Sequence, residues 1–66
     1  MEHGVLKTDE AAERIGLSVS TLEKLRVYGG GPKFLRLGRA VRYRQTDLES
    51  WMAARVVGST SEQVAA

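Results

Sequence analysis

The chain has 66 residues, with ten Lys and Arg against eight Asp and Glu, a formal net charge of +2 and no cysteine. This length predicts one small domain, and the lack of cysteine excludes a disulfide framework and a thiolate metal site. No apolar run is long enough to span a membrane, the N-terminus lacks a signal-peptide pattern, and the single His3 has no clustered carboxylates beside it. We therefore expect a cytoplasmic protein with no membrane partner, no metal, no cofactor and no enzymatic activity.

The first predicted helix covers about residues 9–15, after a short extended segment at residues 5–6. Thr8 is its expected N-cap, because a hydroxyl there can accept from an unpaired N–H of the first turn. Gly16 should end the helix, since glycine adopts positive φ easily. The expected buried stripe consists of Ala11, Ala12 and Ile15.

A second helix is predicted over about residues 19–28, capped by Ser18, with Ser20 as the alternative cap. Ser18 is preferred because it leaves one inward face, made of Val19, Leu22, Leu25 and part of Arg26. At 100° per residue the exposed stripe carries Ser20, Lys24 and Val27, flanked by Thr21 and Tyr28. Small hydroxyls and a cation can contact phosphates or base edges, although an ordinary solvated helix face would look the same. Two short helices joined by a glycine-containing turn are typical of a helix-turn-helix.

The segment after this helix is dominated by positive charge. Gly29–Gly31 and Pro32 break the helix and serve as a connector. Between Lys24 and Arg44 the chain has seven cations and no acid, so the small net charge conceals a strongly basic region. Such a region is either a solvated basic face or a surface for a polyanion, and the pattern favours nucleic acid.

Residues 35–44 alternate in the manner of a β-hairpin. We expect a three-residue loop at 38–40, with Arg39 at the tip, because Leu37 would then face Val41, and Leu35 would face Tyr43. A two-residue loop would instead set Leu35 against Arg42 and mix the apolar and charged faces. The preferred register places Arg36 opposite Arg42, a repulsive pair that phosphates would relieve.

The last predicted helix covers about residues 47–57 and opens with a capping box from Thr46 to Glu49. Its apolar face is expected to consist of Leu48, Trp51, Met52 and Val56. We interpret Trp51 as a core residue rather than a binding residue. The domain should cover residues 5–57, and residues 58–66 are expected to form a flexible tail.

Three helices and a two-stranded wing describe a mainly α chain with a β-hairpin, the winged helix-turn-helix fold. Over about residues 5–57 the chain resembles the excisionase and AlpA-type domains, relatives of the MerR DNA-binding domain. The motifs that carry the resemblance are Thr8-Asp9-Glu10-Ala11-Ala12, Gly16-Leu17-Ser18, Ser20-Thr21-Leu22, Pro32, Arg36-Leu37-Gly38-Arg39, Val41-Arg42-Tyr43 and Asp47-Leu48-Glu49-Ser50-Trp51.

The resemblance implies a nucleoid-associated protein of a bacterium, a phage or another mobile genetic element, with double-stranded DNA as its partner. It implies that the second helix lies in the major groove and the wing lies against the minor groove or backbone. Glu23 departs from the family, which often has an aromatic or basic residue at this position. The resemblance and the charge pattern together predict DNA-binding roles for nine residues. These are Ser18, Ser20, Thr21, Lys24, Tyr28, Arg36, Arg39, Arg42 and Arg44.

Three functions follow as hypotheses. The first is an excisionase-type recombination directionality factor that binds DNA cooperatively, head to tail, bends attachment-site DNA and directs a phage-type integrase to excision. The second is an AlpA-type transcriptional regulator. The third is a protein-interaction adaptor that uses the wing or Phe34, which either lies on the outer face of the hairpin or packs against the connector at 29–31.

Overall fold

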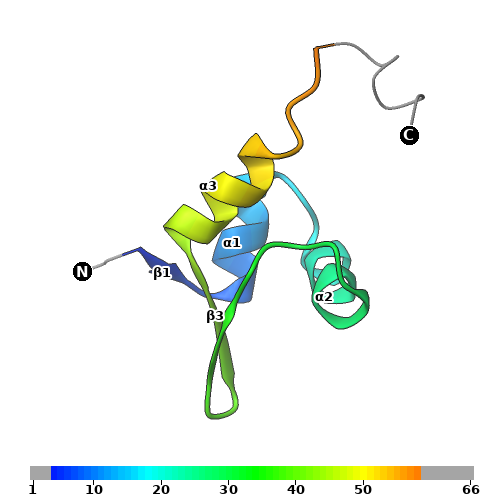
Figure 1. Cartoon of the computed structure of the whole chain (residues 1–66). Helices are drawn as coiled ribbons and strands as arrows, with labels where there is room; N and C mark the ends of the chain where they lie inside the picture. Colours follow the sequence, from blue (N-terminus) through cyan, green and yellow to red (C-terminus); the bar gives the residue numbers. More distant parts are fainter. Residues whose placement is uncertain (1–3, 59–66) are drawn as a thin grey trace.

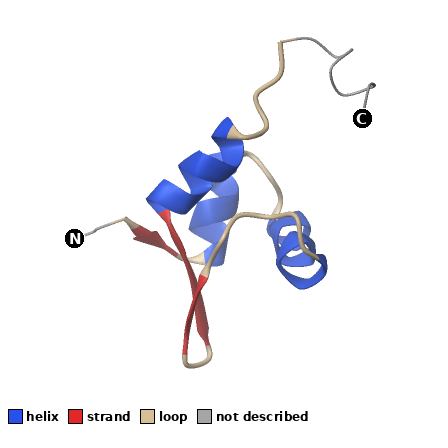
Figure 2. Ribbon diagram, in the orientation of Figure 1, coloured by secondary structure: helices blue, strands red, loops and turns tan. Residues whose placement is uncertain are grey.

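The computed structural model describes residues 4–58 and has the expected fold class, a winged helix-turn-helix (Figure 1, Figure 2). The three strands form one antiparallel sheet in the order β1-β3-β2, so the extended segment at residues 5–6 adds a strand to the expected two-stranded wing. Most of the predicted tail lies outside the described residues. The elements in chain order are β1 (Val5–Leu6), α1 (Thr8–Ile15), α2 (Val19–Tyr28), β2 (Leu35–Leu37), β3 (Ala40–Arg44) and α3 (Gln45–Ala53).

Helix α1 is the central element, because it packs against α2, α3 and β3. Its inward face is made of small alanines, which allow the neighbouring helices to approach closely. Partly buried Leu6, Ile15, Phe34 and Val41 surround the core. The buried residues that form this core are Ala11, Ala12, Leu22, Tyr43 and Leu48.

The start of α1 differs from the prediction. The N-cap is Lys7 and not Thr8, which is the first helical residue. The Lys7 backbone N–H donates to the Glu10 carboxylate at 2.9 Å, so an acid of the first turn reaches back to the cap. The end of the helix is as predicted: Gly16 has φ of 78°, and Leu17 N–H donates to the Ala12 carbonyl at 2.9 Å.

The cap of α2 is Ser18, as predicted. Its Oγ accepts from the Thr21 backbone N–H at 3.1 Å, and the helix covers the expected residues. Leu22 is fully buried, but Val19 is 40% exposed and does not belong to the inward face. Val19 is the first residue of the helix, directly after the Ser18 cap.

Helix α3 begins and ends earlier than predicted. It starts at Gln45, with Arg44 as N-cap, and ends at Ala53. Thr46 is not the cap, because it lies inside the helix. The Gln45 N–H, in the first turn, donates to the Gly4 carbonyl at 2.7 Å, next to β1. Leu48 is buried as expected, whereas Val56 lies beyond the helix and is 80% exposed.

The hairpin register also differs from the prediction. Leu37 pairs with Ala40, Arg36 with Val41, and Leu35 with Arg42, so the loop is the two-residue Gly38–Arg39. Gly38 has φ of 64°, and no non-glycine residue of the described chain has positive φ. This is the sign pattern of a type II′ turn, which suits the twist of paired strands and requires glycine at its first central position.

The new register changes which side chains face the core. Arg36 shares a face with Val41 and therefore, by alternation, with Phe34 and Tyr43, and it is not opposite Arg42. Phe34 does not lie on the outer face but packs against the core, with its ring centroid 6.1 Å from that of Tyr43. The adaptor hypothesis therefore loses Phe34 as an exposed contact.

Leu48→Ala tests this core. The substitution removes a fully buried side chain and should cost about 2–5 kcal/mol of unfolding free energy, comparable to the whole stability of so small a domain. The control Val56→Ala, at an exposed position that the sequence pattern places on the same stripe, should change stability by less than about 0.5 kcal/mol. Denaturant unfolding measures both, and equal losses would mean that the core is misassigned.

Candidate nucleic-acid interface

The exposed face of α2 is polar at its start and aromatic at its end. Burial of Leu22 against α1 turns Ser20, Thr21 and Lys24 toward solvent, and Tyr28 is 84% exposed. The Ser18 hydroxyl accepts the Thr21 N–H and donates to the Thr21 Oγ1 at 2.8 Å. Ser18 is therefore engaged in holding the first turn, and its Oγ also lies 3.5 Å from the Ser20 Oγ. Lys24 is the more available side chain.

The wing projects away from α1 and α3 (Figure 1). Arg39 lies at its tip and is exposed, and Arg36 is exposed on β2. Arg42 is half-buried, and its Nη1 donates to the Val41 carbonyl at 2.8 Å. The predicted wing cations are thus not equivalent, because some already have partners within the chain.

Of the predicted wing cations, Arg44 makes the most hydrogen bonds within the chain. Its Nε donates to Asp47 Oδ2 at 2.7 Å, and its Nη2 donates to Oδ1 at 3.1 Å. This hydrogen bond lowers the pKa of Asp47 below its usual range and raises the pKa of Arg44. The pair joins the end of β3 to the first turn of α3, and it leaves Arg44 less free to contact a phosphate than Arg39.

Arg26 lies where α2 meets the wing. The sequence pattern predicts only that part of its side chain lies on the inward face of α2. Its Nη1 donates to the buried Tyr43 hydroxyl at 3.1 Å, and its guanidinium lies 5.9 Å from the Phe34 ring centroid. The Arg36 guanidinium lies 6.0 Å from the same ring. A cation at an inward helical position was the one sequence signal for this arrangement.

Trp51 holds the glycine connector, and it lies outside the fully buried core in which it was expected. Its indole Nε1 donates to the Gly30 carbonyl at 2.8 Å, and Arg55 Nη2 donates to the same oxygen at 2.9 Å. The Arg55 guanidinium lies 4.3 Å from the Trp51 ring centroid. Trp51 of α3 and Arg55, just beyond the end of that helix, thus hold the connector directly after α2 ends.

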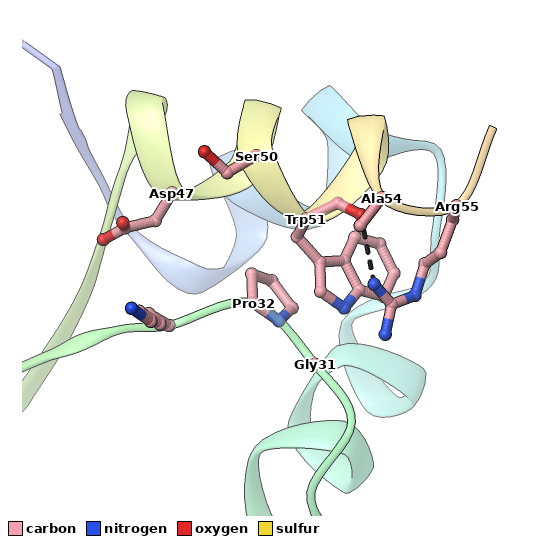
Figure 3. Close-up of a pocket in the computed structure, with 8 residues that line it drawn as sticks. Gly31, Pro32, Asp47, Ser50, Trp51, Ala54 and Arg55 are labelled. Carbon is pink, nitrogen blue, oxygen red and sulfur yellow. Dashed lines mark hydrogen bonds between the residues drawn. The ribbon is translucent and has the colours of Figure 1, made fainter.

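A groove of about 300 Å³ lies between this connector and α3. Figure 3 shows the Pro32 ring near Trp51 at its centre, with Arg55 beside the indole. The connector also approaches α2 closely: a Cβ added at Gly31 would lie 2.8 Å from the Leu25 Cβ. The residues that line the groove are Gly31, Pro32, Lys33, Asp47, Ser50, Trp51, Ala54 and Arg55.

Within residues 4–58, no group of three or more His, Cys, Asp or Glu is placed to hold a metal ion. No helix in this part of the chain has the length and apolar character needed to cross a membrane.

Comparison with protein-family models identifies the module that these elements form. The model of a helix-turn-helix domain matches residues 5–56, which is most of the chain. The chain belongs to this family. A comparison with curated proteins found no match. Membership of the helix-turn-helix family indicates DNA binding, and such domains are typically not enzymes.

The Arg44–Asp47 pair predicts a pH dependence of this helix-turn-helix domain. Because the folded-state pKa of Asp47 is lowered, its contribution to stability is present above the unfolded pKa of about 3.9 and is lost as pH falls through the folded pKa. Thermal melts of the wild type should therefore show falling stability below about pH 4. Asp47→Asn should be less stable at pH 7 and lose less on acidification; identical acid profiles would contradict this assignment.

Proposed function

We propose that the chain binds double-stranded DNA as an excisionase-type architectural protein, with α2 in the major groove and the wing against the adjacent backbone or minor groove. The observation that carries the DNA-binding mode is the combination of a polar, exposed α2 face with a projecting cationic hairpin in one small helix-turn-helix domain. In this motif the second helix enters the major groove and its N-terminal residues contact base edges.

The residues of α2 take different roles in this arrangement. Ser20 and Thr21, in its first turn, are small enough to allow close approach to the groove, and Lys24 follows one turn later. Ser18 caps the helix and orients Thr21. Tyr28, at the far end, carries a phenol that can donate to a phosphate.

Lys24→Ala tests base reading. If Lys24 contacts a base edge, the substitution should cost about 1–3 kcal/mol on a selected site and relax the preference at one base position. Binding of the variant to a panel of single-base site variants measures this. A uniform loss over the panel would make Lys24 a phosphate contact, and unchanged binding would place α2 outside the interface.

Arg39→Ala and Arg44→Ala form a matched pair that tests the wing. Each phosphate contact adds about 0.9 to the slope of log affinity against log salt concentration. Loss of Arg39 should therefore reduce the slope by about one unit, with site preference kept. Loss of Arg44 should reduce it less, because Arg44 already pairs with Asp47. Equal reductions, or none for Arg39, would contradict these wing roles.

The excisionase-type assignment is supported by the resemblance of the motifs and by the size of the domain. A single small module buries only about 600–1,000 Å² on DNA, which leaves little surface for tight and specific binding. Among residues 4–58 the longest helix is α2, with ten residues, so this part of the chain offers no helix for a coiled-coil dimer. We therefore infer head-to-tail assembly of several copies on DNA, with an integrase as the further partner.

The decisive experiment titrates the protein onto DNA carrying one, two or three copies of a site selected from random duplexes. We expect cooperative filling of adjacent copies and a bend measured by circular-permutation gel mobility. Bending occurs when the added contacts offset a deformation cost of order 1–6 kcal/mol. Independent filling of straight DNA would overturn the architectural proposal and favour the AlpA-type transcriptional regulator.

A further inference from the structure

Three side chains form a stack at the junction of α2 and the wing. The guanidinium of Arg26, from the last turn of α2, lies 5.9 Å from the Phe34 ring centroid, and that of Arg36, from β2, lies 6.0 Å from it. We call these three residues the arginine stack. Each cation is within cation–π distance of the same ring, so the Phe34 side chain is shared by a cation from α2 and a cation from the wing.

The positive charges of Arg26 and Arg36 are not balanced by an acidic side chain among residues 4–58, which favours binding of an anion. Within residues 4–58 the carboxylate–guanidinium ion pair is Arg44–Asp47, and neither Arg26 nor Arg36 has an acidic partner. Arg26 is half-buried, so its charge has lost part of its hydration. Of the five N–H donors of its guanidinium, one donates to Tyr43. The other donors and the exposed guanidinium of Arg36 remain available for an oxyanion.

We propose that the arginine stack is a binding site for a backbone phosphate of DNA, additional to the contacts of the α2 face and the wing tip. The proposal rests on the proposed function, because α2 and the wing are the two elements placed on DNA, and the stack joins them. Arginine presents a planar fork that matches phosphate geometry, and the Phe34 ring and Tyr43 hydroxyl hold Arg26 in place before binding. Less side-chain freedom is then lost on association.

The test compares two proteins that differ by one charge. Tyr43→Phe is placed in both, so that no buried hydroxyl is left unpaired, and position 26 is changed to Lys in one and to Met in the other. Binding to a mixed-sequence DNA duplex is followed by fluorescence anisotropy over a salt series, with thermal melts of each protein. We expect similar melting temperatures and a salt slope smaller by about 0.9 in the Met protein.

A second pair, Arg36→Lys and Arg36→Met, changes an exposed residue and does not endanger the fold. It should show the same difference of about 0.9 in slope. Equal slopes within the Arg26 pair would overturn the phosphate role of Arg26 and leave it as a support for Tyr43. Should the Arg26 pair fail to fold, equal slopes within the Arg36 pair would overturn the site.

DNA binding by the wild-type protein distinguishes a failure of this phosphate site from a failure of the proposed function. Salt-dependent DNA binding by the wild type, together with equal slopes within the pairs, overturns the stack alone. Absence of DNA binding by the wild type overturns the proposed function and this site with it. A difference in slope that appears in both pairs, with melting temperatures unchanged, supports the site.

Discussion

The arrangement of this domain depends on one buried phenol. Tyr43 lies in the central strand, where its backbone pairs with Leu6, its ring contacts Phe34, and its hydroxyl accepts from Arg26. A buried tyrosine hydroxyl needs a hydrogen-bond partner, and here the partner comes from α2. The same residue therefore links the sheet, the segment that leads into β2 and helix α2, and it relates the orientation of α2 to that of the wing.

The connector supplies the second constraint on that orientation. Three consecutive glycines leave the backbone with the greatest conformational freedom, yet the Gly30 carbonyl accepts from both Trp51 and Arg55. Gly31 also lies too close to Leu25 for a side chain to fit without movement. A segment that is flexible by composition is thus held by Trp51 of α3 and by Arg55 just beyond it. A DNA ligand would therefore meet α2 and the wing in a preformed arrangement.

The helices and strands were predicted more accurately from the sequence than the side chains that face the core. Helical periodicity predicts α1, α2 and α3, since each buries one stripe. The predicted wing register is wrong, because it places every apolar residue of the two strands on one face. In fact Leu35 and Leu37 lie on the side opposite Tyr43. The Gly38–Arg39 pair was the available signal, because glycine at the first position of a two-residue loop is typical of a type II′ turn. The hydrogen bonds of Gly30 join residues far apart in the chain, and no local pattern predicts them.

The central claim is that the polar face of α2 and the tip of the wing form one DNA-binding surface. Amide chemical-shift mapping by NMR during titration with a selected DNA site tests it most directly. We expect the largest shifts at Ser20, Thr21 and Lys24 and at the Gly38–Arg39 turn, with little change at the exposed end of α1 near Arg14. Shifts confined to α1, or to the groove between the connector and α3, would contradict it.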